Sequence, residues 1–128
     1  MTSATIQPIW NTQLKIQSLP KTVIALPTKE GYELVKEESI LYCKAEGNYT
    51  MILFTNSKSL LISRKLKDTA NCIEGAWFLR IHQSFMVNMR FAKKYIRKNG
   101  GKLVLVDDTI LPISKKYKEQ VLKLFKFV

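Results

Sequence analysis

The alternation of apolar and polar positions along residues 22–62 predicts a series of short strands. β-Branched and alternating apolar runs recur there, separated by segments of turn composition such as Pro27-Thr-Lys-Glu-Gly31. Asn56-Ser57-Lys58 has the composition of a hairpin loop between two of these runs. The strands are expected at residues 22–26, 31–35, 39–43, 49–55 and 59–62.

Two later segments have the apolar spacing of short amphipathic helices. Ser63 is the expected N-cap of a helix over residues 64–70, in which Leu66 and Ala70 lie about one turn apart. Ser114 is the expected N-cap of a last helix. The apolar positions of this last helix recur at i, i+4, i+7, i+8 and i+11, which places on one stripe Tyr117, Val121, Leu124, Phe125 and Val128.

Between these helices, residues 78–95 mix apolar anchors with Arg, His, Gln, Ser, Asn and Lys too irregularly for a single amphipathic element. Such a stretch is suited to holding polar and basic side chains at a surface. The whole pattern predicts a mostly β fold with two short helices. Further strands are expected at residues 94–97, 102–106 and 109–111.

Length and composition indicate one domain preceded by a short arm. The chain has 128 residues, of which 46% are hydrophobic, enough for a core. Residues 1–21 mix Thr, Gln, Ser and two Pro with scattered apolar residues, which is typical of an arm or linker. We therefore expect the compact domain over residues 22–128.

The charge of the chain is unevenly distributed. Lys and Arg number 21 against 10 acidic residues, a net charge of +11. Residues 1–38 carry four Lys and four Glu, so the whole excess falls on residues 39–128. Clustered Lys and Arg favour a polyanion partner, because neutralising phosphates releases counterions. A basic domain without such a partner is the alternative.

The sequence has no membrane or secretion signal. No apolar run approaches the ~20 residues that span a bilayer, and the first residues lack the charged and apolar regions of a signal peptide. The sequence therefore predicts a cytoplasmic protein without a membrane partner. Cys43 and Cys72 lack CxxC spacing, so both are expected as reduced, buried thiols.

Patterns for catalysis and metal binding are missing from the sequence. His82 is the one histidine, and no acid or cysteine lies near it in sequence, which favours a hydrogen-bonded structural role. Gly100-Gly101 lacks the strand and helix of a nucleotide-binding loop, and Asp107-Asp108 has turn composition. We expect no enzyme activity, no catalytic residue, no metal and no cofactor.

Three short segments are stronger binding candidates than the charges on helix faces. Each combines polar and basic residues with a loop end or a helix start, where side chains and N–H groups converge on a phosphate or a base edge. The segments cover residues 46–49, 80–84 and 114–118.

Four successive motifs resemble those of the LytTR DNA-binding domain, found mainly as the output domain of bacterial response regulators. Along residues 22–126 they match in order and spacing as Ile40-Leu-Tyr-Cys-Lys-Ala-Glu-Gly-Asn-Tyr-Thr50, Leu61-Ile-Ser-Arg-Lys-Leu66, Phe78-Leu-Arg-Ile-His-Gln-Ser-Phe-Met-Val-Asn88 and Leu111-Pro-Ile-Ser-Lys-Lys-Tyr117. The resemblance implies an elongated, LytTR-like arrangement of small, mainly antiparallel sheets with two short helices. It also implies that loops, rather than a recognition helix, enter successive major grooves.

The resemblance carries over the family's contact positions. Its base-contacting positions fall on Tyr49, Gln83 and Lys115, where Gln suits adenine and Lys suits guanine. The family often has Arg at the last two positions, so this departure leaves the preferred bases open. The residues expected on the DNA backbone are Asn48, Ser84, Lys116, Arg64, Lys65 and Lys118, and those assigned to the scaffold are Ile81, Phe85, Val87 and Asn88, with Arg80 unassigned.

The resemblance predicts a sequence-specific regulator of transcription in a two-component system, which binds direct repeats in double-stranded DNA as two side-by-side protomers and bends it. Residues 1–38 cannot supply a receiver domain, so the chain is expected as an isolated output domain or as a stand-alone regulator with another partner. The alternative from another class is a protein-interaction module with an incidental basic surface, docked through Ile9, Trp10, Leu14 and Ile16. A single-stranded RNA binder would need several exposed aromatics on one sheet.

Overall fold

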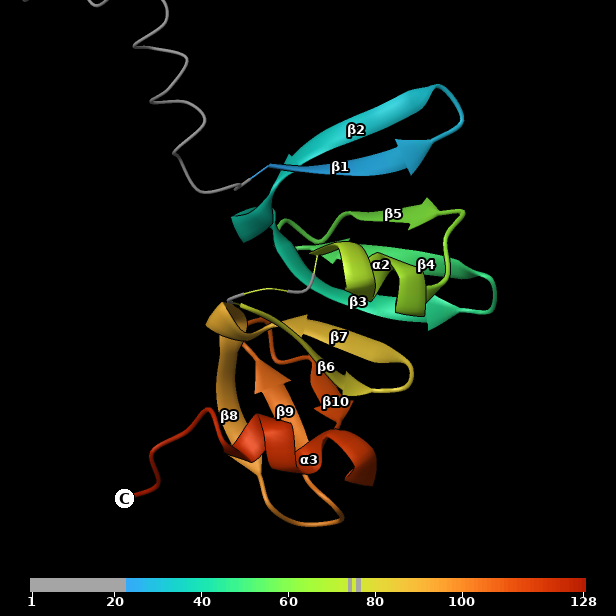
Figure 1. Cartoon of the computed structure of the whole chain (residues 1–128). Helices are drawn as coiled ribbons and strands as arrows, with labels where there is room; N and C mark the ends of the chain where they lie inside the picture. The colour runs from blue at the N-terminus through green and yellow to red at the C-terminus, as the bar shows by residue number, and fades with distance from the viewer. Residues whose placement is uncertain (1–22, 74, 76) are drawn as a thin grey trace, which may run out of the picture.

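In the computed structural model, the described part of the chain comprises residues 23–73, 75 and 77–128. Three antiparallel sheets follow one another along an elongated body (Figure 1). Two α-helices accompany them in the described residues. The expected mostly β fold of small sheets with two short helices is therefore confirmed, whereas the expected arm over residues 1–21 lies outside the described residues.

The elements follow the chain sheet by sheet. The first sheet has two strands, β1 (Val23–Thr28) and β2 (Gly31–Lys36), and a 3₁₀ turn, η1 (Glu37–Ser39), follows it. The central sheet has the order β5-β4-β3-β7-β6, with β3 (Ile40–Glu46), β4 (Tyr49–Phe54), β5 (Ser59–Ile62), β6 (Phe78–His82) and β7 (Phe85–Asn88). After η2 (Met89–Phe91), the third sheet has the order β10-β9-β8, with β8 (Ala92–Ile96), β9 (Lys102–Leu105) and β10 (Ile110–Pro112). The helices are α2 (Leu66–Ile73) and α3 (Lys115–Leu122).

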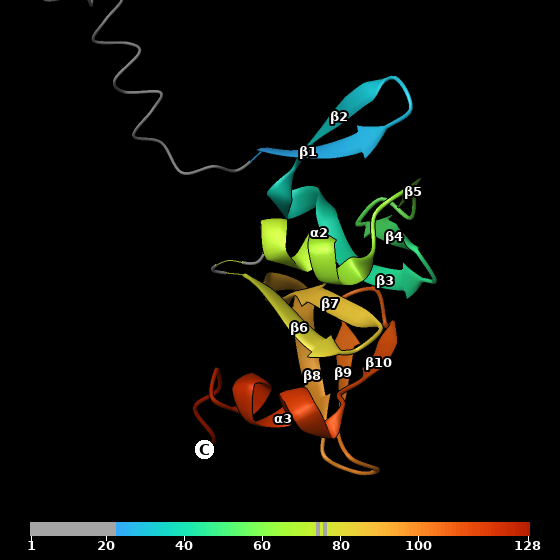
Figure 2. The same ribbon diagram turned by 45° about the vertical axis from the view of Figure 1, so that its right-hand side comes forward.

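The central sheet contributes to two separate cores. One core joins its strands to α2 and β1 through Leu26, Ile40, Cys43, Ile52, Ile62, Leu66, Ala70, Phe78 and Met86. The other joins it to the third sheet and α3 through Leu41, Ile81, Val87, Leu103, Leu105, Leu111, Ile113 and Val121. Figure 2 shows α2 on one side of β6 and β7, with the third sheet and α3 on the other.

These two cores explain the irregular pattern of residues 78–95. Met86 and Val87 are adjacent and both fully buried, because successive residues of β7 enter opposite cores. A register shift between Arg80 and His82 breaks the alternation in β6 as well. The stretch is therefore a hairpin, a 3₁₀ turn and the start of a further strand, in place of one amphipathic element.

Each helix differs from expectation in at least one of its boundaries. α2 begins at Leu66, so Ser63 is not its N-cap and that prediction is wrong. α3 follows Ser114 as expected but ends at Leu122, and the side chain of Ser114 makes no capping hydrogen bond. The expected apolar stripe therefore does not continue as a helix to Val128. Beyond the helix, Leu124 is 56% exposed and Val128 is fully exposed.

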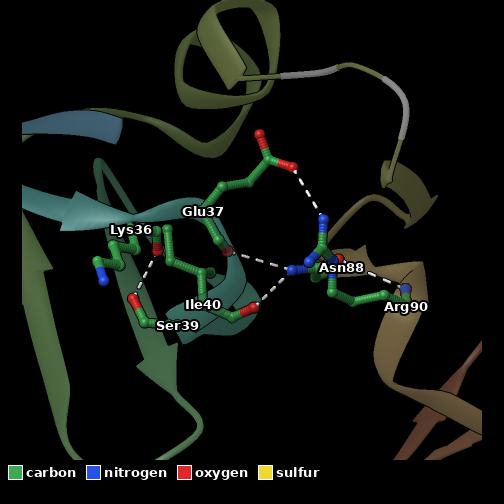
Figure 3. A network of polar contacts seen from close by, with 6 residues as sticks. All are labelled: Lys36, Glu37, Ser39, Ile40, Asn88 and Arg90. Carbon is green, nitrogen blue, oxygen red and sulfur yellow. Dashed lines mark hydrogen bonds and ion pairs between the residues drawn. The ribbon is translucent and has the colours of Figure 1, made fainter. Parts of the chain in front are cut away.

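A polar network around the buried Asn88 joins the two turns that connect the sheets. Asn88 is fully buried, and its Nδ2 donates to the carbonyl of Ile40 at 2.9 Å and to that of Glu37 at 3.3 Å (Figure 3). The Oδ1 of Asn88 accepts from the N–H of Arg90. The guanidinium of Arg90 lies 3.4 Å from the carboxylate of Glu37. Asn88 is thus a scaffold residue that ties η2, at the end of the central sheet, to η1, at its start.

Candidate nucleic-acid interface

One end of the central sheet collects three chain segments that are far apart in sequence. β3 pairs with β4 up to Glu46 and Tyr49, and Lys44 of β3 pairs with Phe85 of β7. Antiparallel pairing therefore places the β3–β4 loop beside the β6–β7 turn. Thr50 pairs with Ile62, so the chain leaves β5 at the same end. The tips of both hairpins lie on the right in Figure 1, together with the start of α3.

The β6–β7 turn is held by hydrogen bonds to its own backbone. Arg80 donates from Nε to the carbonyl of His82 at 2.9 Å and from Nη2 to that of Gln83 at 2.6 Å. The Nδ1 of His82 accepts from the N–H of Ser84 at 3.0 Å. The carbonyl of Ser84 accepts in turn from the N–H of Ala45 in β3 at 2.9 Å. The exposed side chain of Gln83 therefore projects from a fixed backbone.

The structure gives His82 the hydrogen-bonded role expected of it. Its ring also packs against Phe85, with the two ring centroids 5.5 Å apart. Because Nδ1 accepts a hydrogen bond, the proton of the neutral imidazole lies on Nε2. The residue thus supports the turn through its Nδ1 lone pair.

The first turn of α3 is attached to the same hairpin. The N–H of Ser114 donates to the carbonyl of Ile81 at 2.9 Å. The guanidinium of Arg80 lies 5.9 Å from the ring centroid of Tyr117, within the range of a cation–π contact. Arg80 therefore contacts both the β6–β7 turn and α3. This attachment leaves the lysines of the turn exposed or partly exposed, namely Lys115, Lys116 and Lys118.

The β3–β4 loop presents the first predicted base contact. Gly47 has a φ of 62°, which glycine adopts readily, and it closes the loop together with the exposed Asn48. Tyr49 is 47% exposed at the start of β4. Along β3, Glu46 forms an exposed ion pair with Lys44 at 3.5 Å, so the carboxylate of this loop is matched by a cation.

Two buried threonines hold the segment between β5 and α2. The hydroxyl of Thr50 donates to the carbonyl of Arg64 at 2.6 Å, and that of Thr69 donates to the carbonyl of Lys65 at 3.0 Å. The two hydroxyl oxygens are 3.4 Å apart. Arg64 and Lys65 consequently have a fixed backbone and exposed side chains.

Basic residues predominate at this end of the molecule. In the segments described above, Glu46 is the one acidic residue against the basic residues Lys44, Arg64, Lys65, Arg80, Lys115, Lys116 and Lys118. The site is therefore suited to anions.

Within the described residues, no group of three His, Cys, Asp or Glu could hold a metal ion. No helix in that part of the chain has the length and apolar character needed to cross a membrane.

The structure brings Tyr49, Gln83 and Lys115 to one side of the molecule, and their contact with bases remains a prediction. The sequence left Arg80 unassigned and gave no role to Thr50 or Thr69. Their importance lies in hydrogen bonds to backbone carbonyls, which no residue pattern reveals. For Arg80 alone, the sequence offered one signal, a positively charged residue three positions before the turn.

Comparison with known proteins supports the resemblance to LytTR DNA-binding domains that the sequence motifs indicate. Residues 30–126 match the family model of the LytTr DNA-binding domain. A solved structure named as the LytTr DNA-binding domain of a methyl-accepting/DNA response regulator from Bacillus cereus superimposes with a TM-score of 0.70 and 23% identity, covering 84% of this chain and 100% of that one. None of the curated proteins compared matches the chain. Because the family model spans most of its length, this chain belongs to the LytTR DNA-binding domain family.

Proposed function

We propose that this protein is a sequence-specific double-stranded DNA-binding transcription regulator of a bacterial two-component system, acting in the cytoplasm through residues 22–128. One observation supports this above all. Three segments that carry Tyr49, Gln83 and Lys115 lie on one side of the molecule, and basic residues predominate in them. Their tips are loops and a helix start, which suits insertion into the major groove from several points.

Base contacts in this proposal come from the three loop residues. The Gln83 amide can form a bidentate pair with adenine, and Lys115 can donate to the O6 and N7 of guanine. Each such contact discriminates by roughly 1 to 3 kcal/mol against the wrong base. The Tyr49 hydroxyl donates to a base or a phosphate. The three positions contact successive major grooves of a direct-repeat site, with a second protomer on the adjacent repeat.

Backbone contacts set the register without selecting the sequence. We assign six residues to phosphate contacts, and four of the six are basic. The six residues are Asn48, Ser84, Lys116, Arg64, Lys65 and Lys118. Their contacts make the affinity depend on salt, because each neutralised phosphate releases counterions. A receiver domain or another regulatory protein would control access to the site.

In vitro selection of duplexes from a random pool tests the proposal and yields the operator. Gln83→Ala and Lys115→Ala should then relax the base preference at particular positions of the selected site. Lys116→Ala should weaken binding to selected and random duplexes alike. Lys58→Ala is the matched control, because Lys58 is exposed in the β4–β5 loop, at the other end of the central sheet.

Two outcomes would contradict parts of the proposal. Equal losses on selected and random duplexes for Gln83→Ala, Lys115→Ala and Lys116→Ala would remove the distinction between base and backbone contacts. A gel shift with random duplex tests DNA binding itself at low and high salt. No shift at micromolar protein and low salt would favour the protein-interaction module over a DNA-binding function.

A further inference from the structure

The third sheet forms an apolar groove with the segment after α3. Its volume is about 330 Å³, and it is lined by residues of β8 and β9 and by residues 125–128. Three aromatic rings line it in mutual contact, with centroids 6.5 Å apart for Tyr95 and Phe125, 6.4 Å for Tyr95 and Phe127, and 6.1 Å for Phe125 and Phe127. The rings pack tilted or edge to face, so they form one aromatic cluster.

Tyr95 is held from behind by the β8–β9 turn. Gly101 is buried and has a φ of 102°, and a Cβ built on it would lie 3.3 Å from the ring of Tyr95. A side chain at this position would be strained and would press on that ring. The close approach of the glycine backbone therefore fixes the position of the Tyr95 ring in the groove. The aromatic floor of the groove, formed by Tyr95, Phe125 and Phe127, is thus present without a bound partner.

The rim of the groove is basic. Its lining includes Lys93, Lys94 and Lys126 and no acidic residue. Lys93 pairs with Asp108 at 2.6 Å. Lys94 and Lys126 are exposed, and among the described residues neither forms an ion pair with a carboxylate. Two available cations thus flank an aromatic floor on which Phe127 is 66% exposed.

The elements that line the groove lie on the side of the molecule opposite the hairpin tips of the candidate nucleic-acid interface. β8 and the C-terminal segment lie on the left in Figure 1, whereas the tips of the β3–β4 and β6–β7 hairpins lie on the right, and Figure 2 agrees. A ligand in the groove would therefore leave the hairpin tips accessible. The two surfaces can be occupied at the same time.

We propose that this groove is a docking site for an acidic peptide segment of a partner protein, with an aromatic or leucine side chain placed against Phe125 and Phe127. Charge complementarity favours this occupant, because carboxylates beside the anchor would pair with Lys94 and Lys126. The apolar floor gains from burying a side chain. A nucleic-acid strand fits less well, because bases stack on open ring faces, and Tyr95 and Phe125 are partly buried and pack against neighbouring rings.

Selection from a library of displayed random twelve-residue peptides against the full chain tests the proposal. Peptides that bind the wild type and remain after counter-selection on a Lys94→Glu, Lys126→Glu double variant are those that use the groove. We expect these peptides to be enriched in Asp and Glu around Phe, Trp or Leu. Groove-dependent peptides without acidic enrichment, or no groove-dependent peptides at all, would overturn the proposal.

The strongest selected peptide, labelled with fluorescein, then serves in anisotropy titrations. Replacing its acids by amides, or its anchor by Ala, should weaken binding about tenfold, and Phe127→Ala in the protein should do the same. Lys58→Glu reverses one charge outside the groove, as each of the two groove substitutions does inside it, and this control should bind like the wild type. All substituted positions are exposed, so the variants should fold, and circular dichroism with a gel shift on random duplex checks this.

An oligo-dT strand serves as the competing probe. Displacement of the peptide by oligo-dT, lost in Phe127→Ala, would overturn the proposal in favour of a nucleic-acid groove. The proposal does not depend on the function assigned to the hairpin tips. A Gln83→Ala variant should lose base preference while retaining the peptide, which keeps the two failures distinguishable.

Discussion

At the scale of single residues, Cys43 and Cys72 show how position alone separates two chemically identical groups. Cys43 is fully buried in β3, and burial raises the pKa of its thiol to about 12. Cys72 lies on α2 with an exposed side chain, so the expectation that both thiols are buried is wrong for this one. Both are free, as the spacing predicted.

The two thiols should react at different stages of unfolding. A thiol-specific chromogenic reagent at neutral pH should modify Cys72 in the native protein and Cys43 only after denaturant is added, because the reagent needs an accessible thiolate. Cys72→Ser should remove the fast reaction. Rapid modification of two thiols in the native wild-type protein would contradict the burial of Cys43.

The raised pKa of Cys43 also predicts a loss of stability at alkaline pH. The thiol deprotonates near pH 9.0 when unfolded and at about 12 when folded, so between these values the native state holds a proton that the unfolded state has lost. The free energy of unfolding should therefore fall by about 1.4 kcal/mol per pH unit in this window from Cys43 alone. Urea denaturation of the wild type and Cys43→Ala checks this. The variant should lack this part of the slope, and equal slopes would contradict it.

At the scale of elements, hydrogen bonds to backbone carbonyls position the hairpins and the turns. Arg80 supports the β6–β7 turn and contacts Tyr117, so one side chain relates the placement of Gln83 to that of Lys115. Asn88 joins the two turns between sheets in the same way. Neither residue needs to touch a ligand to affect binding.

Removing Arg80 should reduce the selectivity of DNA binding. Arg80→Ala should weaken binding to the selected operator by about tenfold, a loss of ~1.4 kcal/mol, and should weaken binding to random duplex less. The amide resonances of Gln83 and Ser84 should shift in NMR spectra. Equal losses on both duplexes would reduce Arg80 to a charge that attracts DNA.

Replacing His82 should affect the same turn. His82→Asn should shift the amide resonances of Gln83 and Ser84 less than His82→Ala, because the Asn Oδ1 can accept the hydrogen bond that Nδ1 accepts.

Replacing Asn88 should destabilise the whole domain. Asn88→Ala leaves the carbonyls of Ile40 and Glu37 without this donor and should cost about 1 to 3 kcal/mol in the free energy of unfolding. Asn56→Ala is the matched control, because the exposed Asn56 accepts one hydrogen bond from Lys58 within its own loop. Urea denaturation measures both. Equal stabilities of the two variants would argue against a structural role for the network in Figure 3.

The sequence predicted most strands because their residues alternate and polar turns separate them. It failed at α2, where Ser63 has the chemistry of a cap, but the Thr50 hydroxyl donates to the carbonyl of Arg64 and the helix begins only at Leu66. It failed also after Leu122, where Phe125 turns back onto the third sheet instead of continuing the helix. Both errors come from tertiary contacts that local spacing does not contain.

The candidate site could be predicted in part for a similar reason. Polar and basic loop residues such as Gln83 and Lys115 are visible in the sequence and match the motifs of a family. Their common location depends on the pairing of Lys44 with Phe85 and on the bond from Ser114 to Ile81. These contacts join segments that are distant in sequence, so only the fold reveals them.

At the scale of the whole molecule, the basic residues on the side of the hairpin tips should determine how DNA affinity depends on salt concentration. The logarithm of the DNA affinity should fall linearly with the logarithm of salt concentration, with a slope of about −0.9 for each phosphate contact. Lys116→Ala should reduce the magnitude of that slope by about one. Lys58→Ala should leave it unchanged. Fluorescence anisotropy at several salt concentrations measures the slopes, and an unchanged slope for Lys116→Ala would remove Lys116 from the backbone contacts.

The pairing of Lys44 with Phe85 has a consequence for how binding specificity can diversify. This register sets the separation between the β3–β4 loop and the β6–β7 turn, and the two cores on either side of the central sheet maintain it. Substitutions at Tyr49 or Gln83 therefore change which bases are preferred without changing how far apart the contacted positions lie. A new spacing would require an inserted residue within a paired strand, where both cores oppose it. Related domains are thus expected to differ more in the bases that they select than in the spacing between them.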